Sequence, residues 1–70
     1  MSVRQKLIDA LIQKYKSDIA DGIATITVYL ENPVGIGEHP QHLDELDKLV
    51  TKISNAKENL DTIAKHFDDN

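Results

Sequence analysis

At 70 residues and without cysteine, this chain lies near the lower size limit for a stable domain and has no disulfide to reinforce it. A single hydrophobic core in so short a chain rarely supplies more than about 3–5 kcal/mol, which makes self-association the expected source of further stability. The 12 acidic residues outnumber the 8 basic ones, and this excess of negative charge disfavours binding to nucleic-acid phosphates. We therefore predict no nucleic-acid partner.

The first predicted element is a helix over residues 2–31. Ser2 and Gln5 have the S-x-x-Q spacing of an N-terminal capping box. Apolar residues then recur at intervals of three and four: Val3, Leu7, Ile8, Leu11, Ile12, Tyr15, Ile19, Ile23, Ile26 and Leu30. This spacing predicts a single apolar stripe along one helix. The basic residues Arg4, Lys6, Lys14 and Lys16 are interpreted as its solvated face.

Residues 24–30 fit this helix less well than the rest. The run Ala-Thr-Ile-Thr-Val-Tyr-Leu is rich in β-branched residues and alternates apolar with polar side chains, a pattern that is typical of a strand. A solitary strand would have no partner in this chain and would leave an exposed edge. We therefore predict that the helix continues through these residues.

Both prolines and two of the three glycines fall between Asn32 and Pro40. Proline disfavours helix in the residue before it and is accepted at the first position of a new helix. The sequence therefore predicts a loop over residues 32–39 and a second helix over residues 40–67. In that helix, Leu46, Ile53, Leu60 and Phe67 recur every seven residues, as do Leu49, Ala56 and Ile63. These are the a and d positions of a heptad pattern, which Val50 and Ala64 broaden at e positions.

Two helices of about 42 Å joined by a short loop predict an antiparallel hairpin as the only domain, residues 1–70. Each apolar stripe is wider than one neighbouring helix can cover. The expected fold is therefore an all-α antiparallel two-helix hairpin that dimerises into a four-helix bundle.

A candidate metal site is formed by His39, His42 and Glu45, which are spaced three apart and would share one helix face. Imidazole and carboxylate groups bind zinc, but the spacing lacks the specific H-E-x-x-H pattern. Because both histidines continue the a/d register backwards from Leu46, the competing interpretation is that they close the end of the bundle. We predict no cofactor. A zinc-induced rise in melting temperature that is lost in His39→Ala would favour the metal site.

The loop offers a second candidate site. Gly35 and Gly37 precede a helix, as in phosphate-binding loops, but the lysine and hydroxyl residue that would follow are replaced by Glu38 and His39. We interpret the glycines as turn residues. Val34 and Ile36 either cover the bundle end or, if they project outward, contact a partner together with Gly35 and Gly37.

The pairs Asp18-x-x-Asp21 and Asp44-x-x-Asp47 resemble acidic pairs with which some all-α nucleotide pyrophosphatases hold magnesium. Asp44 and Asp47 fall at heptad positions that face solvent, whereas metal sites in bundles project inward. No nucleophile with an adjacent base is evident, so the sequence predicts no enzyme. It also has neither a signal-peptide pattern nor an apolar run of membrane-spanning length, and the expected location is the cytoplasm.

The segment N-P-V-G-I-G-E-H-P, residues 32–40, resembles one in small uncharacterised proteins of tailed phages that infect marine cyanobacteria and related bacteria. This resemblance implies a phage-encoded or phage-derived protein that acts in host cytoplasm, and it brings no activity or site residues with it. The expected function is a non-enzymatic structural or protein-interaction module whose partners are a second copy and a phage or host protein. The alternative is a small ligand- or metal-binding protein that uses the loop and the start of the second helix.

Overall fold

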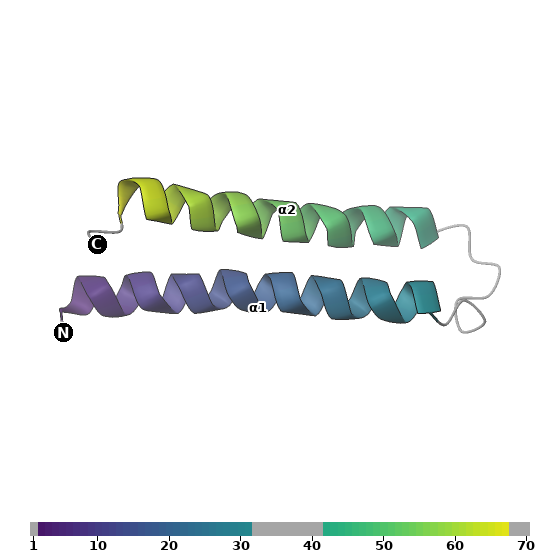
Figure 1. The fold of residues 1–70 in the computed structure, drawn as a ribbon, viewed down its shortest axis with the longest axis horizontal. Coiled ribbons are helices and arrows are strands. Elements are labelled where there is room, and N and C mark those ends of the chain that lie inside the picture. The colour runs from purple at the N-terminus through teal and green to yellow at the C-terminus, as the bar shows by residue number, and fades with distance from the viewer. Residues whose placement is uncertain (1, 32–41, 68–70) are drawn as a thin grey trace.

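Two long helices lie side by side in opposite directions in the computed structural model, which describes residues 2–31 and 42–67 (Figure 1). Helix α1 spans Val3–Glu31 and helix α2 spans His42–His66. The two helices pack against each other, and no strand occurs in the described residues, so the predicted all-α antiparallel hairpin is confirmed. The predicted loop, with Val34, Gly35, Ile36, Gly37 and His39, lies outside the described residues. Phe67, predicted as helical, lies in a turn just after α2.

Helix α1 begins with a side-chain cap. The backbone N–H of Gln5 donates to Ser2 Oγ at 3.0 Å, which satisfies one of the amide groups that have no partner within the first helical turn. The side-chain amide of Gln5 donates to Asp9 Oδ1 at 2.9 Å. The capping-box prediction therefore holds for the Ser2 half.

The β-branched run 24–30 is helical, as predicted, because α1 continues without interruption to Glu31. The hydroxyl groups of Thr25 and Thr27 donate to the carbonyl oxygens of Asp21 and Ile23, four residues earlier, at 2.8 and 2.7 Å. These bonds satisfy the threonine hydroxyls within the helix. Packing of Ile26 and Tyr29 toward α2 then outweighs the strand preference of the run, because that preference depends on a neighbouring strand, and none is available in the described residues.

Helix α2 carries its charges in the order that a helix dipole favours. Asp44 and Glu45 lie in its first turn, and Lys65 and His66 lie in its last turn. Acidic groups stabilise the positive N-terminal end of the dipole and basic groups the negative C-terminal end. The backbone N–H of Phe67 adds one bond to Ile63 O at 2.9 Å beyond the last helical residue.

The interface between the helices follows the predicted heptad on α2. Among the described hydrophobic residues, Ala56 and Ile63 are buried, and the remaining a and d residues from 46 to 60 are half-buried. The facing residues of α1 are Gln5, Ile8, Ile12, Tyr15, Ile19, Gly22, Ile26 and Tyr29, all half-buried except for the fully buried Gly22. These residues also recur as a seven-residue pattern, with a positions at 5, 12, 19 and 26 and d positions at 8, 15, 22 and 29.

The helices approach each other closely at Gly22. A Cβ atom placed on Gly22 would lie 2.6 Å from Cγ1 of Ile53 and 3.5 Å from the carbonyl oxygen of Leu49, so α2 occupies the space that a side chain would need. Tyr29 meets His42 edge to face, with ring centroids 6.3 Å apart. At the other end, the Arg4 guanidinium donates to Phe67 O at 3.1 Å. These contacts fix the register of the hairpin, in which facing residue numbers add to between 71 and 75.

Helix α2 covers only part of the apolar stripe predicted on α1, in line with the expectation that one neighbouring helix cannot cover its full width. Val3, Leu7, Leu11, Ile23 and Leu30 are exposed rather than packed on α2. One neighbouring helix covers only the a and d positions, whereas these five residues lie beside that seam. They divide between its two sides.

Candidate functional site

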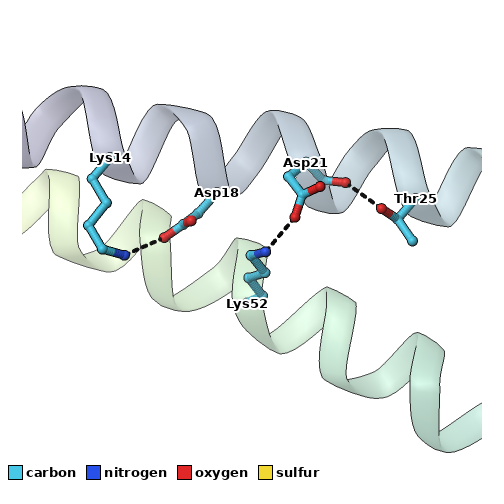
Figure 2. Close-up of polar contacts among 5 residues, drawn as sticks. All are labelled: Lys14, Asp18, Asp21, Thr25 and Lys52. Atoms are coloured by element: carbon cyan, nitrogen blue, oxygen red, sulfur yellow. Dashed lines mark hydrogen bonds and ion pairs between the residues drawn. The ribbon is translucent and has the colours of Figure 1, made fainter.

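The first side of the hairpin is polar near its middle. We call Lys14, Asp18, Asp21 and Lys52 the ion-pair edge (Figure 2). Lys52 of α2 pairs with Asp21 of α1 across the helix interface, and Lys14 pairs with Asp18 along α1 at 3.0 Å. Asp18 and Lys52 occupy g positions of their helices. In an antiparallel pair, the g positions of both helices lie along one edge and the e positions along the other.

The hydrogen bond to Asp21 raises the pKa of Lys52 above its ordinary value of 10.5, and the negative charges of Asp21 and Asp18 act in the same direction. The fold thus favours the protonated amine. Its contribution to stability is fully present below the ordinary pKa and is lost as the pH rises through the raised pKa. The effect should be small, because exposed ion pairs are screened by water.

We therefore expect Lys52→Gln to be less stable than the parent protein at neutral pH, with the difference disappearing at a pH above the raised pKa of Lys52. Urea unfolding midpoints of both proteins, measured from neutral to strongly alkaline pH, test this. A midpoint difference that stays constant across this range would show that the ammonium charge is not its source.

The opposite side of the hairpin is apolar in the half nearest the connection between the helices. Ile23 and Leu30 of α1 and Leu43 and Val50 of α2 occupy e positions, and we call these four residues the apolar edge. Their exposed fractions lie between 52% and 77%. By the hairpin register, Ile23 lies level with Val50 and Leu30 lies level with Leu43. Both helices therefore supply large apolar side chains to one continuous surface.

A shallow surface pocket on α2 adjoins the apolar edge. It is lined by Val50, Ile53, Ser54, Lys57 and Glu58. Val50 belongs to both features, and the exposed part of Ile53 extends the apolar surface toward the a/d seam. The next e positions toward the chain termini are Lys16 and Lys57, both exposed, so charge bounds the apolar edge on that side.

A second exposed apolar surface lies near the start of α1. Val3, Leu7 and Leu11 are spaced four apart and are 73%, 62% and 42% exposed, and we call them the N-terminal strip. Leu11 occupies a g position, which places the strip on the same side as the ion-pair edge. In contrast to the apolar edge, the strip comes from one helix alone.

The predicted metal site is only partly within the described residues. His42 is half-buried beside Tyr29. Glu45 forms an ion pair with Lys48, with 3.4 Å between Oε1 and Nζ. Over residues 2–31 and 42–67, no three His, Cys, Asp or Glu side chains gather closely enough to hold a metal ion. The predicted third ligand, His39, lies outside that range, as do the predicted contact residues Val34 and Ile36 with Gly35 and Gly37.

The two carboxylate pairs do not form a shared site. Asp18 and Asp21 pair with lysines, whereas Asp44 and Asp47 are exposed on α2. In the described part of the chain, neither helix combines the length and apolar character that crossing a membrane requires.

The apolar edge was not predicted from the sequence. The sequence does contain a pattern that indicates it, because Ile23 and Leu30 are seven residues apart, as are Leu43 and Val50. Without a heptad assignment for α1, its e positions could not be matched with those of α2. Comparison with protein-family models, curated proteins and solved structures finds no match for this chain.

Proposed function

We propose that this chain is a non-enzymatic structural or protein-interaction module that works as a homodimeric helical hairpin, with two hairpins forming a four-helix bundle. The observation that carries the proposal is the imbalance between buried and exposed apolar side chains. Only Ala56 and Ile63 are buried among the described hydrophobic residues, whereas nine large ones are exposed. Such an imbalance is typical of a surface that a partner covers.

The resemblance of residues 32–40 to small proteins of tailed phages supports a role in phage biology, and host cytoplasm is the proposed location. In this proposal, a phage or host protein is the further partner. The dimer supplies the stable scaffold, and the surfaces left outside it remain available for that partner.

Sedimentation velocity and thermal melting at several protein concentrations test the proposed dimer. We expect about twice the chain mass of 7.8 kDa, and a melting temperature that falls on dilution because dissociation and unfolding are linked. A cooperative melt that is independent of dilution, together with a monomer mass at micromolar concentration, would falsify the proposal.

A further inference from the structure

We propose that the apolar edge is the surface that joins the two copies, and that the two hairpins overlap there with their long axes antiparallel. In this arrangement a twofold axis passes through the middle of Ile23, Leu30, Leu43 and Val50. The inference rests on the proposed homodimer and adds which residues make it and how the copies are oriented.

Three properties distinguish this edge from the other exposed surfaces. Both helices contribute to it, so a second copy placed there packs against both helices of the first, as the hairpins of a four-helix bundle do. Its four adjacent e positions carry no charge, whereas the cross-helix ion pair of Lys52 with Asp21 occupies the opposite edge. The exposed part of Ile53, in the wall of the adjoining pocket, continues the apolar surface along α2. The N-terminal strip, by comparison, consists of residues from α1 alone.

A second copy matches this edge better than an unrelated partner does. The four residues are large, apolar and matched in level across the hairpin, so the surface is complementary to itself under a twofold rotation, as isologous dimers require. A second copy also supplies what this chain lacks, because a 70-residue chain without cysteine, with two buried hydrophobic residues in its described part, commonly gains stability by self-association.

The lysines beside the apolar edge determine the orientation. In a parallel dimer, Lys16 and Lys57 of one copy would face the same two lysines of the other, which would bring four positive charges together. In an antiparallel overlap centred on the apolar edge, Lys16 and Lys57 of one copy instead lie about 30 Å along the rod from the same two lysines of the other copy, at a rise of 1.5 Å per residue. At that distance, salt at physiological concentration screens the repulsion.

Glutamate substitutions test which edge joins the copies. Val50 on the apolar edge and Leu7 on the N-terminal strip are 57% and 62% exposed, so Val50→Glu and Leu7→Glu place the same charge at equally accessible helix positions. We expect Val50→Glu to weaken dimerisation at least about 100-fold, because it leaves an unpaired charge in an apolar interface, and Leu7→Glu to leave the dissociation constant within about threefold. Sedimentation equilibrium measures both constants.

Circular dichroism shows whether the hairpin itself survives each substitution. Leu43 is the most exposed residue of the apolar edge, at 77%, so Leu43→Glu perturbs the interface between the two helices least. We expect Leu43→Glu to weaken dimerisation like Val50→Glu while it retains helical signal at high protein concentration. A helical Leu43→Glu protein that dimerises as tightly as the parent would overturn the assignment of this edge.

Spin labels test the orientation without disturbing the apolar edge. The chain has no cysteine, so Ala64→Cys gives one labelling site, which is exposed and lies at an e position level with Asp9. The antiparallel overlap predicts about 50 Å between the two labels, whereas a parallel dimer places them within about 20 Å. Double electron–electron resonance distinguishes these distances.

The outcomes separate the two levels of the proposal. A parent protein that is monomeric at all concentrations would contradict both the proposed function and this inference. If the parent dimerises but Leu7→Glu dissociates it and Val50→Glu does not, the dimer stands and the apolar edge is the wrong surface. A short Ala64→Cys label distance in an otherwise Val50-sensitive dimer overturns the antiparallel overlap.

Discussion

Ile63→Ala should cost about 2–4 kcal/mol of unfolding free energy, because it removes a branched side chain from a packed interface and leaves a cavity. Ile63 is 7% exposed and is one of the two buried hydrophobic residues in the described part of the chain. By the hairpin register, it lies between the levels of Ile8 and Ile12. A small helical fold holds only about 3–5 kcal/mol in its own core, so this variant should be largely unfolded at low protein concentration.

Urea titration followed by circular dichroism at one fixed protein concentration measures this loss. Ile63→Val provides a graded comparison, with an expected cost of about 0.5–1.5 kcal/mol. Val28→Ala is the matched control, because Val28 is 62% exposed and lies away from both α2 and the apolar edge. If Ile63→Ala changes stability no more than Val28→Ala does, the heptad seam is not the core of this protein.

Gly22→Ala should destabilise the hairpin, although alanine is the better helix former. The gain in helix propensity is about 1 kcal/mol. Against it, the new methyl group would lie 2.6 Å from Ile53 Cγ1, which sits next to the branched Cβ and cannot move without rotation of the whole side chain or separation of the helices. Overpacking of this kind typically costs about 1–3 kcal/mol. The overpacking cost exceeds the gain in helix propensity, so we expect a net loss of about 1 kcal/mol of unfolding free energy.

A double-mutant cycle with Ile53→Ala isolates the close contact. Removal of Cγ1 should reverse the sign, so that Gly22→Ala stabilises the Ile53→Ala protein by about 0.5–1 kcal/mol through helix propensity alone. Unfolding of all four proteins in the same concentration of trimethylamine N-oxide keeps the weakest one measurable. Additive effects with no change of sign would place the helices further apart than this structure does.

The sequence was sufficient to predict the two helices, because the spacing of apolar residues is a local property of the chain. The heptad on α2 also assigned Ala56 and Ile63 to inward-facing positions, and both are buried. Residues 24–30 were harder, since their composition favours a strand. The decisive argument was topological, because a strand with no partner leaves its backbone hydrogen bonds unsatisfied.

Features that depend on the relation between the helices could not be predicted in the same way. The division of the α1 stripe follows from which half of it meets α2, and that depends on the rotation of one helix relative to the other. Glycine is a poor helix residue, and the role of Gly22 is visible only once Ile53 is placed opposite it. The apolar edge likewise required the register that Asp21 with Lys52 and Tyr29 with His42 establish.

The contact between Arg4 and Phe67 has a practical consequence for anyone who attaches cargo to this protein. It brings the first and last described turns together at one pole of the rod (Figure 1). Two fluorophores attached to these turns would therefore lie beside each other, far from the end of the hairpin at which Tyr29 meets His42.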